Sequence, residues 1–194
     1  MQRRSSLAAA LLLGIVAGCT TPSSVPASSP SVRPAISGTP VARPAGYNEF
    51  ISGTASYSVC YPGSWTPLER VLLDDGHDGD MFVGPPGETV NMVATIISES
   101  AGELGSAAYA EAAIQNLRGR GIGILRADLV VVDGVAATVV TFPRLTARGQ
   151  RYTVRETIWA SGGRGWVYIV VYDPPLEPNA ISLAEAMLAC FRRV

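Results

Sequence analysis

The sequence predicts an α+β fold in which a mainly antiparallel sheet is flanked by helices. Stretches rich in β-branched and aromatic residues recur along residues 47–194, and short glycine-containing turns join several of them. Two other segments, beginning at residues 106 and 178, carry apolar residues at helical spacing. Because hairpin turns reverse the chain between neighbouring strands, we expect an antiparallel sheet with both helices packed on it.

The first half of this domain is predicted to form four strands. Tyr57, Val59 and Tyr61 alternate with smaller residues over 55–61, and Pro62 and Gly63 then end the strand. Three more strands are expected at residues 67–73, 81–83 and 89–98, with a polar loop over residues 74–80.

A helix is predicted to begin at Ser106, whose hydroxyl suits an N-cap. Alanine is abundant in this segment, and one face of the helix carries Tyr109, Ala113, Asn116 and Leu117. Glycines at 119, 121 and 123 end the helix.

Four further strands and a closing helix are predicted for the second half. Residues 124–132 and 135–142 flank Asp133-Gly134, a two-residue hairpin turn, because glycine tolerates a positive φ. Residues 150–160 and 166–172 flank a looser glycine-rich turn, and Asp173-Pro174-Pro175 breaks the sheet. The closing helix, residues 178–193, has an apolar stripe of Ala180, Ala184, Met187, Leu188 and Phe191, with Cys190 beside it.

Composition excludes some partners. The 194 residues are 47% hydrophobic and carry a net charge of −1, which supports a real core and does not fit a basic nucleic-acid binder. Neither the dinucleotide glycine motif nor a phosphate loop is present. We therefore expect no nucleic acid partner and no cofactor.

The N-terminus has the parts of an export signal. Arg3 and Arg4 precede an apolar run over residues 7–16, which is shorter than the roughly 20 residues of a membrane-spanning helix. The following Val16-Ala17-Gly18-Cys19 resembles the lipobox of bacterial lipoproteins. That resemblance implies cleavage after residue 18, a lipid of the palmitate type on Cys19, and a position on the extracytoplasmic face of a bacterial membrane. An ordinary secretory signal followed by a chance cysteine is the alternative.

Residues 19–46 are predicted to be a disordered linker after the lipidated Cys19. The stretch 20–46 contains six prolines, six serines and no acidic residue, and cannot bury enough surface to fold. An extended chain of this composition reaches up to roughly 80 Å. We interpret it as a passive tether, with a glycosylated Ser/Thr stalk as the alternative. Removal of 1–18 changes the net charge to −3, so lipid rather than surface charge would hold the protein at the membrane.

The remaining cysteines, Cys60 and Cys190, form an even pair in a compartment that permits oxidation. We predict a disulfide that ties the first strand to the last helix. Two buried free thiols are the alternative.

An acidic loop surrounds the single histidine. Asp74, His77, Asp78 and Asp80 are weak candidates for binding a cation. The spacing is not that of an EF-hand, because Gly76 and Pro85 occupy positions that need oxygen ligands. A solvated acidic loop is the favoured interpretation, so no metal is predicted.

An arginine cluster is the other candidate site. Arg144, Arg148, Arg151 and Arg155 surround one hairpin end, and the first three are weak candidates for holding an anionic ligand. The simpler explanation of these arginines is that they protect a sheet edge and keep the protein soluble. No Gly-x-Ser-x-Gly elbow is present, so no catalytic residue is assigned and we predict that the chain is not an enzyme.

Residues 55–65, ASYSVCYPGSW, resemble the opening of PsbP-like domains, in which an aromatic first strand runs into proline and then tryptophan. The central helix, the hairpin at 132–136 and the arginine-rich strand before 168–172 are also similar. The resemblance implies an α/β/α sandwich over residues 47–194. The family includes the extrinsic photosystem II protein and bacterial envelope lipoproteins similar to LpqN and DcrB. Its members are mostly non-enzymatic, and it supplies no functional residue to carry over.

Together these observations predict a lipid-anchored envelope protein that acts as a binding or assembly-accessory module, with an envelope protein as the expected partner. The alternatives are a hydrolase with an atypical site and a weak metal-binding protein that uses residues 74–80. A cleft that brings His77 to a serine or cysteine would favour the hydrolase.

Overall fold

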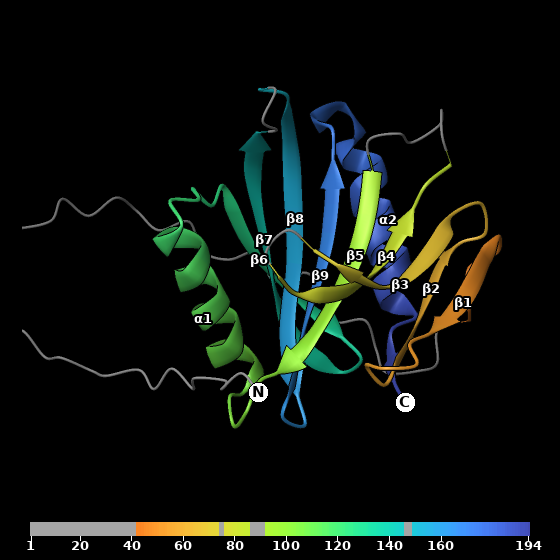
Figure 1. Ribbon diagram of the computed structural model, residues 1–194, viewed down its shortest axis with the longest axis horizontal. Helices are drawn as coiled ribbons and strands as arrows, with labels where there is room; N and C mark the ends of the chain where they lie inside the picture. The colour runs from red at the N-terminus through yellow and green to blue at the C-terminus, as the bar shows by residue number, and fades with distance from the viewer. Residues whose placement is uncertain (1–41, 74–75, 86–91, 146–148) are drawn as a thin grey trace, which may run out of the picture.

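Two antiparallel sheets form the centre of the computed structural model, which describes residues 42–73, 76–85, 92–145 and 149–194 (Figure 1). The large sheet has the strand order β3-β4-β5-β9-β8-β7-β6, and the small sheet has the order β1-β2-β10. The large sheet consists of β3 (Thr66–Leu72), β4 (Asp78–Val83), β5 (Met92–Ser100), β6 (Arg126–Val132), β7 (Val135–Leu145), β8 (Arg151–Ser161) and β9 (Arg164–Tyr172). The small sheet consists of β1 (Tyr47–Ile51), β2 (Tyr57–Pro62) and β10 (Arg192–Arg193).

The helices cover opposite faces of the large sheet (Figure 1). α1 (Ser106–Gly119) packs on β7 and β8, whereas α2 (Glu177–Ala189) packs on β9 and β2 after a short 3₁₀ turn, η1 (Pro174–Leu176). All strand pairs among the described residues are antiparallel. The predicted fold class is therefore confirmed.

The alternation of side chains along the central strands divides the core in two. In β9, Trp166, Tyr168 and Val170 face α2 and the small sheet, whereas Val167 and Ile169 face α1. The α2 side is dominated by aromatic residues, and Phe191 stacks on Tyr57 with ring centroids 5.4 Å apart. Burial of such rings contributes much of the apolar stabilisation of the domain.

The predicted order of four strands, helix, four strands and helix needs two additions. β1 and β10 were not expected, and β2 pairs with them rather than with the large sheet. These strands were missed because β1 carries polar Asn48 and Glu49, and β10 pairs through only two residues. The closing helix ends at Ala189, because the chain after Cys190 turns back to pair with β2.

The predicted polar loop 74–80 is also shorter than expected, because β4 already begins at Asp78. Asp80 is 4% exposed: its carboxylate accepts hydrogen bonds from the Tyr57 hydroxyl at 2.5 Å and from the Arg70 backbone N–H at 3.0 Å. An acidic residue with two donors is stable inside a sheet, so polarity alone gave a wrong prediction here.

Ser106 does not cap α1 as predicted, because the N-cap is Gly105. Its hydroxyl instead donates to the Ala136 carbonyl at 2.5 Å and accepts from the Ala160 N–H at 3.2 Å. The side chain thus joins the start of the helix to β7 and β8.

Cys60 in β2 and Cys190 at the C-cap of α2 form a disulfide with their Cα atoms 5.5 Å apart. Both residues are buried. The bond joins the last helix to the small sheet, which contains the first predicted strand.

Among the described residues, we find no helix that is long and apolar enough to cross a bilayer. The proposed signal, Cys19 and residues 19–41 of the linker lie outside the described residues.

Candidate functional site

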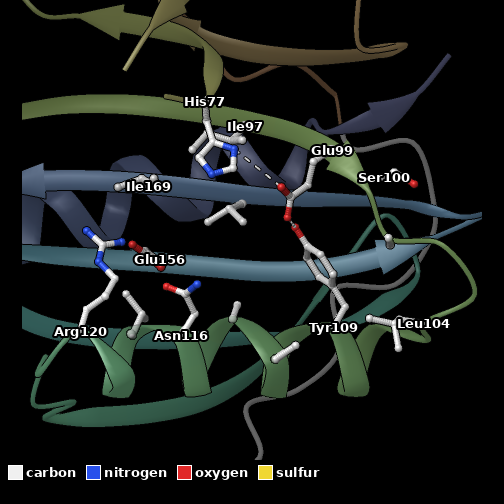
Figure 2. Close-up of a pocket in the computed structure, with 15 residues that line it drawn as sticks. His77, Ile97, Glu99, Ser100, Leu104, Tyr109, Asn116, Arg120, Glu156 and Ile169 are labelled. Atoms are coloured by element: carbon white, nitrogen blue, oxygen red, sulfur yellow. Dashed lines mark hydrogen bonds and ion pairs between the residues drawn. The ribbon is translucent and has the colours of Figure 1, made fainter. Parts of the chain in front are cut away.

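A groove of about 360 Å³ lies between α1 and the sheet face that α1 covers only in part (Figure 2). Its apolar floor is formed by Ile97 from β5 and by Val167 and Ile169 from β9. One wall is α1, which presents Ala112, Ala113, Asn116, Leu117 and Arg120.

The position of α1 creates this groove. Tyr109, Ala110, Ile114 and Leu117 are the buried residues of the helix, and they hold it over β7 and β8. The side chains of β5 and β9 next to it are therefore only partly covered: Val167 and Ile169 are half-buried, whereas Ile97 is buried. Because strand side chains alternate, Ile97, Val167 and Ile169 lie on this face together with the polar Glu99 and Glu156.

A chain of polar groups crosses the groove from the segment before β4 to α1. The Tyr109 hydroxyl donates to Glu99 Oε1 at 2.6 Å, and the other carboxylate oxygen lies 3.7 Å from His77 Nδ1. Figure 2 shows the Glu99 carboxylate between the imidazole ring and the phenol. Burial, and then the hydrogen bond with Glu99, raise the pKa of Tyr109, so the phenol stays protonated and keeps donating.

Gly165 of β9 makes room for the Tyr109 ring. A Cβ atom at position 165 would lie 2.3 Å from Tyr109 Cζ and 2.7 Å from its hydroxyl oxygen. Real Cβ atoms do not approach other atoms this closely, so any side chain at position 165 would displace the phenol from Glu99.

The candidate metal-binding residues do not come together. His77 points into the groove on the α1 side, whereas the Asp80 carboxylate bonds Tyr57 on the α2 side. Among the described residues, there is no group of three or more His, Cys, Asp or Glu side chains that could hold a metal ion. Asp74 lies outside the described residues, and Asp78 is exposed.

Ser100 also lines the groove, so a histidine and a serine share one cleft, as an atypical hydrolase would require. The Glu99 carboxylate, however, lies between the His77 ring and Ser100 (Figure 2). Ser100 Oγ instead accepts a hydrogen bond from the Gly102 N–H at 3.3 Å. A serine without an adjacent base is a weak nucleophile, so His77 and Ser100 do not form the pair that the hydrolase alternative requires.

The candidate anion-binding arginines are elsewhere. Arg144 and Arg151 are exposed at the shared end of β7 and β8, and neither lines the groove. Arg148 lies outside the described residues, and Arg155 is buried on the opposite face of the sheet.

Sequence reasoning missed most of the polar groups of the groove: Glu99, Asn116, Arg120 and Glu156. The helical spacing predicts only that Asn116 lies on a packing face of the helix. The best available signal is Glu156, which lies two residues from the apolar Val154 and Ile158 and therefore shares their core-facing side of β8.

No protein-family model and no curated protein match this chain. Solved structures do match it. The solution structure of cyanobacterial PsbP from Synechocystis sp. is similar with a TM-score of 0.59 and 11% identity, covering 82% of this chain and 99% of that one. The yeast Ran-binding protein Mog1p has a TM-score of 0.53 at 11% identity, covering 76% and 95% of the two chains.

A protein from Bacteroides thetaiotaomicron is also similar, with a TM-score of 0.54, 18% identity, and coverage of 77% of this chain and 49% of that chain. Identities this low define the fold alone. The chain therefore has a PsbP-like fold, as the sequence resemblance implied.

Proposed function

We propose that this chain is a non-enzymatic binding or assembly-accessory lipoprotein of the bacterial cell envelope. In this proposal Cys19 carries the lipid, residues 20–46 form the tether, and the groove beside α1 holds a segment of an envelope protein. The groove carries the argument, because it combines a partly exposed apolar floor with hydrogen-bonding groups at its edges.

The shape of the groove favours a peptide segment. It runs beside α1 with Ile97, Val167 and Ile169 beneath it, so apolar side chains of a partner would be buried there. Asn116 and Arg120 lie along the helix wall, where they can donate hydrogen bonds to the backbone carbonyls of a bound segment. The yeast neighbour of the same fold is a Ran-binding protein, which supports a protein partner for this fold.

The rest of the sequence supports an extracytoplasmic position. The export signal and the tetrad ending in Cys19 provide an anchor, and acyl chains contribute about 0.8 kcal/mol for each buried methylene. The disulfide between Cys60 and Cys190 fits an oxidising compartment.

Site-specific photocrosslinking in intact cells tests the groove. A photoreactive amino acid is placed at Ala112, which lines the groove, and in a matched variant at Gln115, which is exposed on α1 and is not a lining residue. We expect a defined crosslinked species from position 112 and none from position 115. Equal crosslinking from both positions, or none from position 112, would contradict the proposed binding surface.

A blocking variant gives a second measurement. Ala112→Arg places a long charged side chain in the groove and should abolish the crosslink from a photoreactive residue at Ala113, which also lines the groove. Gln115→Arg is the control and should leave it unchanged. Cell fractionation shows whether each variant still reaches the membrane.

A further inference from the structure

A buried arginine lies on the α2 face of the large sheet, on the side opposite the groove. Arg155 is 9% exposed, and its Nε has no hydrogen-bond partner in the described part of the chain. None of the ion pairs between described residues includes it. Burial lowers the pKa of its guanidinium, as expected for a cation removed from water without a bonded counter-ion. Such a group is costly to a fold unless something pairs with it.

Two further polar residues lie in line with Arg155. Arg126 of β6 is directly opposite Thr141 of β7, and Thr141 is directly opposite Arg155 of β8. Directly opposed residues of antiparallel strands point to the same face, with Cβ atoms about 4.5–5.5 Å apart. The three therefore form a cross-strand row on one face of the sheet, with Thr141 between the two arginines.

The row is open at one end. The Arg126 side chain is 62% exposed at the edge strand β6, whereas Thr141 is 8% exposed. The main contacts of α2 with the sheets are to β9 and β2, and η1 contacts β8, so α2 is centred on β9 rather than on β6. The exposed end of the row, at Arg126 of β6, is where a small solute would enter.

The nearby negative charges leave Arg155 without a direct partner. The Asp128 carboxylate lies 2.7 Å from Arg126 Nε and compensates that arginine. Tyr172, Asp128 and Glu185 attract the Arg155 guanidinium electrostatically. One cation of the row is thus paired and the other, more buried one is not.

We propose that Arg155, Thr141 and Arg126 bind a small oxyanion, the carboxylate or phosphate group of a free solute. The planar guanidinium fork matches two oxygens of such a group, and the Thr141 hydroxyl donates to a third position. The Asp128 carboxylate repels an anion, so the affinity of this site for the anion is expected to be weak. This site is separate from the groove and does not depend on the proposed partner.

Thermal unfolding of the full chain in non-ionic detergent tests the site. Phosphate and acetate are each compared with chloride at equal ionic strength, and the two anions distinguish the ligand classes. We expect Tm to rise by about 3–6 °C at ten times the Kd of the preferred anion. Arg155→Met should abolish that rise, yet in chloride it should be at least as stable as the unsubstituted chain, because it removes an unpaired charge. Arg144→Gln, an exposed arginine of the same hairpin, should keep the full rise.

Three outcomes would overturn the proposal. They are no anion-specific rise in the unsubstituted chain, the same rise in Arg155→Met, and a loss of the rise in Arg144→Gln. If Arg155→Met does not fold, Thr141→Val replaces it and should reduce the rise. Broadening of the phosphate ³¹P resonance by the unsubstituted chain, and not by Thr141→Val, gives an independent readout, and equal broadening would count against the site.

Discussion

Gly165→Ala tests whether the groove depends on the contact between β9 and the Tyr109 ring. The added methyl would lie 2.3 Å from Tyr109 Cζ, and its three nearest neighbours all belong to the Tyr109 side chain. The phenol must therefore move away, and it loses its 2.6 Å hydrogen bond to Glu99.

Two terms set the size of the effect. Overpacking costs about 1–3 kcal/mol, and a hydrogen bond to a charged group contributes about 1.5–3 kcal/mol. Glu99 is 40% exposed, so water replaces part of that bond. We expect the free energy of unfolding to fall by about 2–4 kcal/mol, measured by denaturant titration.

A double-mutant cycle makes the explanation specific. In a Tyr109→Ala background the new methyl has room, so Gly165→Ala should then cost less than about 1 kcal/mol. Gly119→Ala is a matched control, because a Cβ at position 119 meets no atom within 4 Å, and stability should be unchanged or slightly raised. Equal costs of Gly165→Ala in both backgrounds would refute the steric reasoning.

Three further predictions concern the cystine, the tyrosines and the anchor. Replacing Cys60 and Cys190 with serine removes a disulfide that closes a loop of 130 residues, and should lower the free energy of unfolding by about 4–5 kcal/mol. Detection of two free thiols in the unsubstituted chain, by mass spectrometry without reductant, would contradict the disulfide. Burial raises the pKa of both Tyr57 and Tyr109 above the ordinary tyrosine pKa of about 10. Above pH 10 the folded protein therefore keeps phenol protons that the unfolded chain loses. Stability should therefore be constant between about pH 7 and 9 and fall above pH 10, with a shallower fall in Tyr57→Phe. Cys19→Ala should move the protein from the membrane fraction to the soluble fraction, and normal retention would count against lipidation.

The groove illustrates why functional geometry was harder to predict than secondary structure. His77, Glu99 and Tyr109 come from a loop, a strand and a helix, and each has an ordinary local explanation. The sequence places His77 among acidic residues of its own loop, but in space its imidazole lies beside Glu99. Only the packing of α1 across the sheet brings these groups together.

The sequence by itself determined the local elements and the proposed cellular address. Alternating residues indicated most strands, Asp133-Gly134 indicated a hairpin, and the apolar stripe near residue 180 indicated the closing helix, because these signals depend only on neighbouring residues.

The tertiary structure decided which strands share a sheet and which faces remain uncovered. Alternation shows that residues such as Arg155 and Thr157 share a face, but it does not show what lies above that face. Burial of Asp80 beside Tyr57, the opening beside α1 and the unpaired Nε of Arg155 all depend on contacts between segments distant in the chain. Such contacts follow from how whole elements pack, and local sequence periodicity carries no information about them.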